Sequence, residues 1–263
     1  MRFARTIIAA ALLIAADVAA SPARAAEIPP AERRSGFSFM SPDTQAMQNE
    51  DTANPGMLWV LDGETLWKAK AGAASKACAD CHGDISASMK GVAARYPAFD
   101  NALGRPADLE QRINLCRVGH QQAPPLPYES RELLALTALV AQQSRGVAIE
   151  TGADPQLKPF IDKGRELFMQ RQGQLNLACA NCHDDNWDKR LAGSAITQAH
   201  PTGYPLYRLE WQSLGSLQRR LRGCITGVRA QAYDFGAPEL VELELYLMTR
   251  ARGMPVETPA VRP

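Results

Sequence analysis

Two copies of the pentapeptide Cys-x-x-Cys-His are the residues of this chain whose types and spacing point most clearly to chemistry. They are Cys78-Ala-Asp-Cys81-His82 and Cys179-Ala-Asn-Cys182-His183. The pattern is typical of covalent attachment of a c-type haem, because two thiols add to the haem vinyl groups and the adjacent histidine reaches the iron. The sequence therefore predicts two covalently bound haem c groups, with thioethers at Cys78, Cys81, Cys179 and Cys182 and iron ligands at His82 and His183.

Paired Cys-x-x-Cys motifs also occur at zinc sites and at thiol–disulfide redox sites. A structural zinc site needs four ligands, and a thioredoxin-like motif needs a βαβ setting. The sequence around the two motifs shows neither pattern, so covalent haem is the preferred interpretation.

Two further cysteines, Cys116 and Cys224, remain after the four thioether positions are assigned. Both lie before the last predicted helix of their half of the chain, where a cytochrome c usually places its sixth iron ligand. Spare cysteines in an oxidising compartment most often form a disulfide, but a bond between these two would join separate haem pockets. A cysteine thiolate also binds haem iron and donates electron density to it, so we predict that Cys116 and Cys224 are axial ligands.

Other residues compete for the sixth position. His120 in the first half and His200 in the second are the alternative ligands, although His200 follows His183 by only 17 residues. Met89 comes soon after the first motif, and Met254 lies beyond the last predicted helix, so neither methionine fits well.

Basic residues crowd around Cys224: Arg219, Arg220 and Arg222 precede it, and Arg229 follows. Arginine favours the thiolate form of a nearby cysteine, and its forked donors bind planar or tetrahedral oxyanions. A solvated basic helix face is the alternative explanation for Arg219 and Arg222. Arg220 would lie one helical turn before Cys224, so we predict that Arg220 and Cys224 are catalytic residues.

An internal repeat positions these residues. The offset between matching residues is 101 at the haem motifs, 108 after them and 107 in the last helices. The matches are Gly63-x-x-Leu66-Trp67 with Gly164-x-x-Leu167-Phe168, Tyr96-Pro97 with Tyr204-Pro205, and Leu109-x-x-Arg112-Ile113-x-x-Cys116 with Leu217-x-x-Arg220-Leu221-x-x-Cys224. Arg112 therefore holds the place of Arg220 but has fewer basic neighbours, which makes the second repeat our choice of active site.

Each repeat reads as helix, haem motif, loop and helix. Apolar spacing predicts entering helices over 59–70 and 157–171 and leaving helices over 130–145 and 238–251, with glycine at the helix stops. This order resembles the class I cytochrome c fold, so we expect an all-α chain of two tandem class I cytochrome c-like domains. The expected division is a signal peptide (1–25), an N-terminal arm (26–56), the first domain (57–146), a linker (147–157) and the second domain (158–263).

The N-terminal residues read as a secretory signal. Arg2 and Arg5 precede the apolar run 7–16, and Ala23-Arg24-Ala25 offers a cleavage site, so we expect a soluble periplasmic protein. No later apolar run is long enough for a membrane span. A net charge of +1 argues against nucleic-acid partners and against electrostatic membrane binding. The arm that follows has no clear periodicity, and we expect a flexible segment or a strap on a partner.

The chain resembles the SoxA family of the SoxAX cytochromes over roughly residues 55–261. Beyond the two haem motifs, the resemblance is carried by four stretches. They are Cys-Ala-Asn-Cys-His-Asp-Asp-Asn-Trp (179–187), Arg-Leu-Glu-Trp-Gln-Ser-Leu-Gly-Ser-Leu-Gln-Arg-Arg-Leu-Arg-Gly-Cys (208–224), Gly-Val-Arg-Ala-Gln-Ala-Tyr (227–233) and Glu-Thr-Pro-Ala-Val-Arg (257–262). Some family members keep one haem, so this chain is similar to the dihaem type.

The resemblance implies an L-cysteine S-thiosulfotransferase that joins thiosulfate to a cysteine of a SoxYZ-like carrier protein. The product is a cysteine S-thiosulfonate, and two electrons leave through a SoxX-like monohaem cytochrome in a heterodimer. In the family, the residue matching Cys224 ligates the catalytic haem and is found as a persulfide, and the match to Arg220 binds substrate.

Three alternatives stay open from the sequence. A thiosulfate dehydrogenase would form tetrathionate without a carrier protein, but would be expected to keep a methionine or lysine ligand on its second haem. A plain dihaem electron-transfer cytochrome leaves Cys224 without a purpose. A dihaem peroxidase would need an open or displaceable ligand position, against which the two spare cysteines argue.

Overall fold

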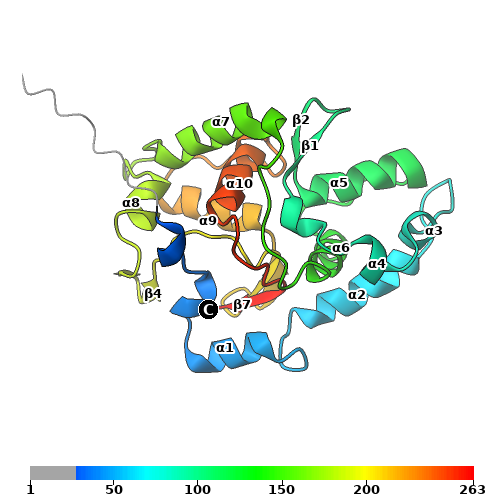
Figure 1. Ribbon diagram of the computed structural model, residues 1–263, viewed down its shortest axis with the longest axis horizontal. Helices are drawn as coiled ribbons and strands as arrows, with labels where there is room; N and C mark the ends of the chain where they lie inside the picture. The colour runs from blue at the N-terminus through cyan, green and yellow to red at the C-terminus, as the bar shows by residue number, and fades with distance from the viewer. Residues whose placement is uncertain (1–27) are drawn as a thin grey trace, which may run out of the picture.

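The repeat forms two units with the same order of elements, in a computed structural model that describes residues 28–263 (Figure 1). The signal peptide expected over 1–25 lies outside the described residues. In Figure 1 the first unit lies to the right in cyan and blue-green, and the second lies to the upper left in green, yellow and red.

The first unit begins with a long helix, carries the haem motif on a one-turn helix and ends with a second long helix. Its elements are α2 (Met57–Lys68), α3 (Cys78–His82), α4 (Ile85–Ser88), a 3-10 turn (Ala93–Arg95), β1 (Ala98–Asp100), β2 (Arg105–Ala107), α5 (Leu109–Cys116), a π turn (Arg117–Gln121) and α6 (Arg131–Gln142).

The second unit keeps the long helices, the motif helix and the β-hairpin of the first, has a small hairpin in place of α4 and the 3-10 turn, and adds a final strand. Its elements are a 3-10 turn (Pro155–Leu157), α7 (Lys158–Met169), α8 (Cys179–His183), β3 (Arg190–Leu191), β4 (Ser194–Ala195), β5 (Leu206–Arg208), β6 (Ser213–Gly215), α9 (Leu217–Gly227), α10 (Pro238–Arg250) and β7 (Ala260–Arg262). The predicted duplication and the four predicted long helices are confirmed.

The leaving helix of the first unit is shorter than expected, because α6 ends at Gln142 rather than near Gly146. Gln143 and Ser144 donate to carbonyls three residues back, which tightens the last turn. Gly146 then has φ +80°, a conformation that glycine adopts without strain. The sequence located the glycine stop but not the tightened turn before it.

In each unit the two long helices cross at a glycine. A Cβ added at Gly63 of α2 would collide with the carbonyl oxygen of Ala135 of α6. A Cβ at Gly164 of α7 would collide with the carbonyl of Glu242 of α10. The backbones therefore approach closely at both crossings, and each crossing is part of an apolar core that includes Trp67 in the first unit and Phe168 in the second.

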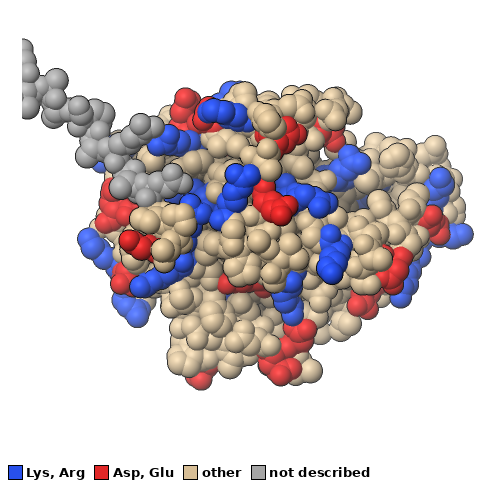
Figure 2. Space-filling view, in the orientation of Figure 1, with Lys and Arg blue, Asp and Glu red and all other residues tan. Residues whose placement is uncertain are grey.

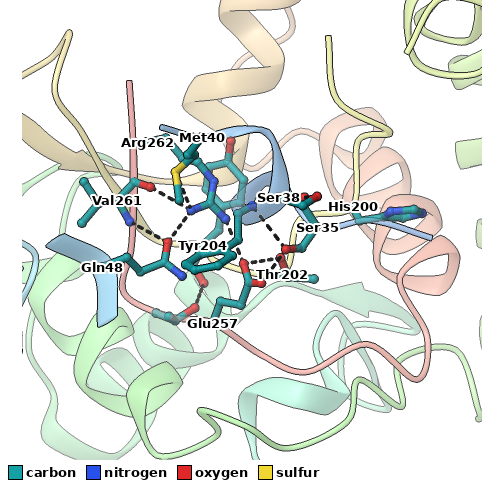
Figure 3. Close-up of polar contacts among 12 residues, drawn as sticks. Ser35, Ser38, Met40, Gln48, His200, Thr202, Tyr204, Glu257, Val261 and Arg262 are labelled. Carbon is teal, nitrogen blue, oxygen red and sulfur yellow. Dashed lines mark hydrogen bonds and ion pairs between the residues drawn. The ribbon is translucent and has the colours of Figure 1, made fainter. Parts of the chain in front are cut away.

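The N-terminal arm lies along the second unit of its own chain, drawn blue in Figure 1. It contains 3-10 turns at Pro30–Glu32 and Gly36–Phe39 and the helix α1 (Pro42–Asn49). Arg262 of β7 donates to Gln48 of α1 and, at 2.8 Å, to Glu257, which also accepts a hydrogen bond from Ser35 (Figure 3). These contacts fix the arm beside the C-terminal strand.

The connector between the units is also packed. The amide of Ile149 donates to Met254 O at 2.9 Å, and Gly253 donates back to Ile149 O at 2.9 Å. Ile149 is 1% exposed. The connector and the segment after α10 therefore hold each other in the interface between the two units.

The interface encloses a cavity of about 50 Å³. Two carboxylic acids line it, Glu110 from α5 and Glu244 from α10. Burial, and then the charge of Asp108, raise the pKa of Glu110 to about 8. Asp108 is itself fully buried, and Gln218 of the second unit donates to it at 2.7 Å. Acidic groups that form no ion pair within residues 28–263 therefore lie between the units.

Charged side chains of both signs are interspersed over the face shown in Figure 2. This distribution agrees with the net charge of +1. In the part of the chain that the structure describes, no helix is long and apolar enough to cross a membrane.

Candidate functional site

Both haem motifs form one-turn helices that are closed in the same way. In α8, the side chain of Asn181 accepts a hydrogen bond from the amide of Ala178 at 3.0 Å. In α3, Asp80 does the same for Ala77 at 2.8 Å. The variable residue before the second cysteine therefore caps each helix at its start. The two thiols of each motif, three residues apart, share one helix face with room for two thioethers.

His183 is held by a hydrogen bond from Nδ1 to the carbonyl oxygen of Thr197, at 2.6 Å. With Nδ1 acting as the donor, Nε2 is the nitrogen free to bind a metal, as in histidine ligands whose other nitrogen is fixed by a second residue. Burial lowers the pKa of His183, opposed by this hydrogen bond. Burial therefore favours the neutral imidazole, and the hydrogen bond to Thr197 orients its ring.

The residue that anchors His183 lies in a segment that is longer in the second unit than in the first. The offset between the repeats rises from 101 to 108 residues between the motif and the Tyr-Pro pair, so this segment is seven residues longer in the second unit. It contains the β3–β4 hairpin and Thr197. His82 of the first motif is exposed, and its ring lies 5.7 Å from that of Trp67.

The structure places each spare cysteine beside the motif of its own unit. Burial, and then the nearby charge of Cys224, raise the pKa of both Cys179 and Cys182. In the first unit, burial raises the pKa of Cys78 most, the charge of Arg117 lowers it, and the nearby charge of Cys116 raises it. All six cysteines are free, so the structure forms no Cys116–Cys224 disulfide.

The alternative histidine ligands make other contacts. His120 is exposed on the π turn after α5. His200 is 7% exposed, and its Nδ1 lies 2.9 Å from the carbonyl oxygen of Arg34 in the N-terminal arm. Burial lowers the pKa of His200 to about 4. This arrangement favours a structural role for His200.

Arg220 lies on α9, so the segment is helical, which is the condition on which the sequence placed Arg220 one turn before Cys224. Its side chain therefore lies one turn before Cys224, on the same face. Arg220 is exposed, and among residues 28–263 no acidic side chain lies within ion-pair distance of it. The site thus presents an uncompensated guanidinium next to the cysteine sulfur.

The other arginines before Cys224 contact aromatic rings. The Arg219 guanidinium lies 4.2 Å from the ring centre of Trp211 and 3.7 Å from Glu129. The Arg222 guanidinium lies 4.5 Å from the ring centre of Phe235. Of the arginines that precede Cys224 in α9, Arg220 alone has neither kind of contact in the described chain.

Two residues that the sequence analysis did not select lie near Arg220 and Cys224 in the structure. Arg208 of β5 is close enough for the charges of Arg220 and Cys224 to act on its pKa, which burial lowers first. Burial raises the pKa of Tyr204, and the same Arg220 and Cys224 are the next largest influences on it. The 108-residue offset was the available signal, because it pairs Tyr204 with Tyr96 and Arg208 with Asp100.

The donor set fits haem c. Each unit brings two thiols, a histidine and a third cysteine together beside its own apolar core. Within residues 28–263, no three or more His, Cys, Asp and Glu side chains are arranged to hold a bare metal ion. The Cys-x-x-Cys-His spacing, with one further cysteine in each unit, suits a covalently attached porphyrin.

Comparison with known proteins identifies similar chains. A family model described as "SoxA/TsdA, cytochrome c domain" matches residues 62–149 and 163–256. The L-cysteine S-thiosulfotransferase subunit SoxA of Rhodovulum sulfidophilum is 38% identical over 231 residues, which cover 88% of this chain and 80% of the relative. The subunit of the same name from Pseudaminobacter salicylatoxidans is 39% identical over 232 residues, covering 88% and 81%.

The fold has a solved counterpart. The crystal structure of SoxXA from P. pantotrophus contains a chain with a TM-score of 0.85 and 31% identity, covering 88% of this chain and 87% of that one. The two segments matched by the family model coincide with the two units. The prediction of two tandem, mostly helical cytochrome c domains is therefore confirmed.

Proposed function

The chain belongs to the SoxA/TsdA family of c-type cytochromes, whose cofactor is covalently bound haem c, and from this premise we propose that it is a SoxA-type L-cysteine S-thiosulfotransferase subunit. The proposed reaction joins thiosulfate to a cysteine thiol of a carrier protein as an S-thiosulfonate, with release of one proton and two electrons. When bound, haem supplies the one-electron redox chemistry.

Both motifs hold haem in this proposal. Cys78 and Cys81 form the thioethers in the first unit, and Cys179 and Cys182 form those in the second. His82 and Cys116 would bind the iron in the first unit, and His183 and Cys224 would bind it in the second. The support is that each third cysteine lies beside the motif of its own unit and that Nε2 of His183 is free.

The observation that carries the function is Arg220, which lies one helical turn from Cys224 and has no ion-pair partner in the described part of the chain. Thiosulfate is a dianion, and its approach to a thiolate is opposed by charge repulsion. A guanidinium offsets this repulsion and donates charge-assisted hydrogen bonds to the sulfonate oxygens. Arg220 therefore orients the terminal sulfur of thiosulfate toward the Cys224 sulfur.

Two steps complete the proposed chemistry. The Cys224 thiolate and the terminal sulfur of thiosulfate form a sulfur–sulfur bond with loss of two electrons. The carrier thiolate then attacks the terminal sulfur, and Cys224 leaves as a thiolate. A persulfide on Cys224 is a further form that this proposal includes.

Partners and location follow the same proposal. A SoxX-like monohaem cytochrome is the electron-accepting subunit of a heterodimer, and a SoxYZ-like protein presents the carrier cysteine. The similar solved structure is one of SoxXA, and the N-terminal sequence pattern favours secretion to the periplasm.

Product analysis tests the function. The holoprotein with its cytochrome partner would be incubated with thiosulfate, a carrier protein with one cysteine and an electron acceptor. The expected product is the carrier with one thiosulfonate group on its cysteine, detected by mass. Tetrathionate as the main product, with the carrier unmodified, would favour a thiosulfate dehydrogenase, and oxidation of neither would favour an electron-transfer cytochrome.

A further inference from the structure

The two units carry opposite charges at one equivalent position. The hairpin of β1 and β2 pairs Asp100 with Arg105, and the hairpin of β5 and β6 pairs Arg208 with Ser213. Asp100 and Arg208 are each the last residue of the first strand in their hairpin. Arg208 therefore takes, in the second unit, the place that Asp100 has in the first.

In the first unit this position neutralises the arginine of the haem pocket. The guanidinium of Arg112 and the Asp100 carboxylate form an ion pair at 3.0 Å. The other carboxylate oxygen of Asp100 accepts hydrogen bonds from the amides of Ala102 and Leu103, so the acid is held in place. An arginine beside Cys116 thus has a fixed counter-charge.

In the second unit the counter-charge is replaced by another cation. Arg220 holds the place of Arg112, and no acidic partner for it exists within residues 28–263. The Arg208 side chain is 13% exposed, and the positive charge of Arg220 adds to burial in lowering its pKa. Two neighbouring guanidinium groups repel each other, and an anion bound between them relieves that repulsion.

The contacts of Arg208 leave part of its guanidinium group available. Its NH2 nitrogen pairs with Glu210 at 3.0 Å, and the group lies 5.1 Å from the ring centre of Trp211. Its Nε is buried and has no hydrogen-bond partner among residues 28–263. Glu210 is 66% exposed, so water and salt weaken its pairing with Arg208. A buried donor without a partner is costly unless a ligand accepts its hydrogen bond.

We propose that Arg208 is a second anion-binding residue and that Arg208 and Arg220 together bind the sulfonate group of thiosulfate beside the Cys224 sulfur. The identity of the anion rests on the proposed function, whereas the charge reversal between positions 100 and 208 is a feature of the structure alone. The same pair recognises other tetrahedral sulfur oxyanions, so sulfate serves as an unreactive probe.

Calorimetric titration of the oxidised holoprotein with sulfate and with thiosulfate tests the proposal. We expect Arg208→Gln to raise the dissociation constant for both anions about 10- to 100-fold, the loss typical of a hydrogen bond to a charged group. Arg208→Lys should give a smaller rise, because the charge remains but the fork is lost. Arg112→Gln in the first unit is the matched control and should leave both constants unchanged. Haem absorbance and circular dichroism spectra would check that each variant folds.

The outcomes separate this inference from the proposed function. Unchanged binding in Arg208→Gln with weakened binding in Arg220→Gln would overturn the role of Arg208 and leave the function standing. Unchanged binding in Arg208→Gln and in Arg220→Gln would contradict this inference and the proposed function alike. If Arg208→Gln does not fold, Glu210→Gln replaces it, because removal of the competing carboxylate should lower the dissociation constant about two- to fivefold at low salt. An unchanged constant in Glu210→Gln would then count against the proposal.

Discussion

The two haem units share their helices, their motif and their third cysteine, yet they differ in charge and in how the histidine is held. In the first, Arg112 is paired with Asp100 and His82 is exposed. In the second, Arg220 is near enough to a second arginine, Arg208, for its charge to act on the pKa of Arg208, and His183 is anchored by a backbone carbonyl. Duplication therefore supplies two similar units, and a few residues give the second the positive charge that the proposed anionic substrate requires.

The two units keep the contact between their long helices but differ in the side chains of the site. The glycine crossings at Gly63 and Gly164 are the same in both units, because helix contact depends on backbone approach. The site residues diverge, because a single side chain on a strand end changes the field in a pocket without disturbing the helices. This divergence is the basis of our proposal that the second unit carries the active site.

The largest expected effect is a difference in reaction rate between variants of the two spare cysteines. Cys224→Ser should lower the rate of carrier thiosulfonation at least about a thousandfold, because the attacking sulfur is lost. Cys116→Ser should change the rate only a few-fold. Rates would be measured with the cytochrome partner present. Equal losses in the two variants would mean that the units do not differ in role.

The next largest effect is expected on kcat/KM, where substitution of Arg220 and of Arg112 should give different results. Arg220→Gln should lower kcat/KM for thiosulfate about 10- to 100-fold, because a charge-assisted contact to the substrate is removed. Arg112→Gln should leave kcat/KM within about twofold, since its guanidinium is already paired with Asp100. Steady-state kinetics at low and high salt would measure both. A similar loss in Arg112→Gln would contradict the assignment of the active site.

Substitution of the glycine at each helix crossing should lower the stability of the protein by a similar amount. Gly63→Ala and Gly164→Ala each place a methyl group against a backbone carbonyl and should lower the free energy of unfolding by about 2 to 3 kcal/mol. Denaturant unfolding of the haem-loaded protein would compare them. A loss in one unit only would show that the two crossings are not equivalent.

A smaller, pH-dependent effect is expected from the cavity between the units. Burial, and then the charge of Asp108, raise the pKa of Glu110 to about 8 from an ordinary value of 4.5, so the folded state binds the extra proton in this range. Its contribution to stability is therefore present at low pH and is lost as pH rises toward 8, by at most about 1.4 kcal/mol per pH unit. Glu110→Gln should flatten this dependence.

Denaturant unfolding between pH 5 and pH 8 measures the effect, and the exposed Glu64→Gln on α2 is the matched control. Asp108, Glu129 and Glu244 carry the neighbouring charges that act on or respond to Glu110. If Glu110→Gln and Glu64→Gln gave the same pH profile, Glu110 would not be the titrating group.

Local patterns predicted much of this molecule. The Cys-x-x-Cys-His spacing located both attachment helices, and the constant offset located the units. The four-residue spacing of Arg220 and Cys224 placed them on one face, because a helix fixes the geometry between close neighbours.

What the sequence did not predict depends on contacts between distant segments. Arg208 lies 16 positions before Cys224 on a short strand, so helical spacing could not connect them. A comparison with Asp100 across the repeat would have drawn attention to it. The course of the N-terminal arm depends on Arg262 and Glu257, more than 200 residues away in sequence, and no local pattern encodes such a pairing.

One digest can compare the two pockets directly. Trypsin releases Cys116 in the peptide 113–117 and Cys224 in the peptide 223–229, so both sulfurs can be weighed in the same sample of holoprotein before and after anaerobic thiosulfate. We expect sulfur added to the peptide 223–229, reversed by reduction, and no change in the peptide 113–117. Equal modification of both peptides, or of neither, would contradict the conclusion that the second unit alone is the active site.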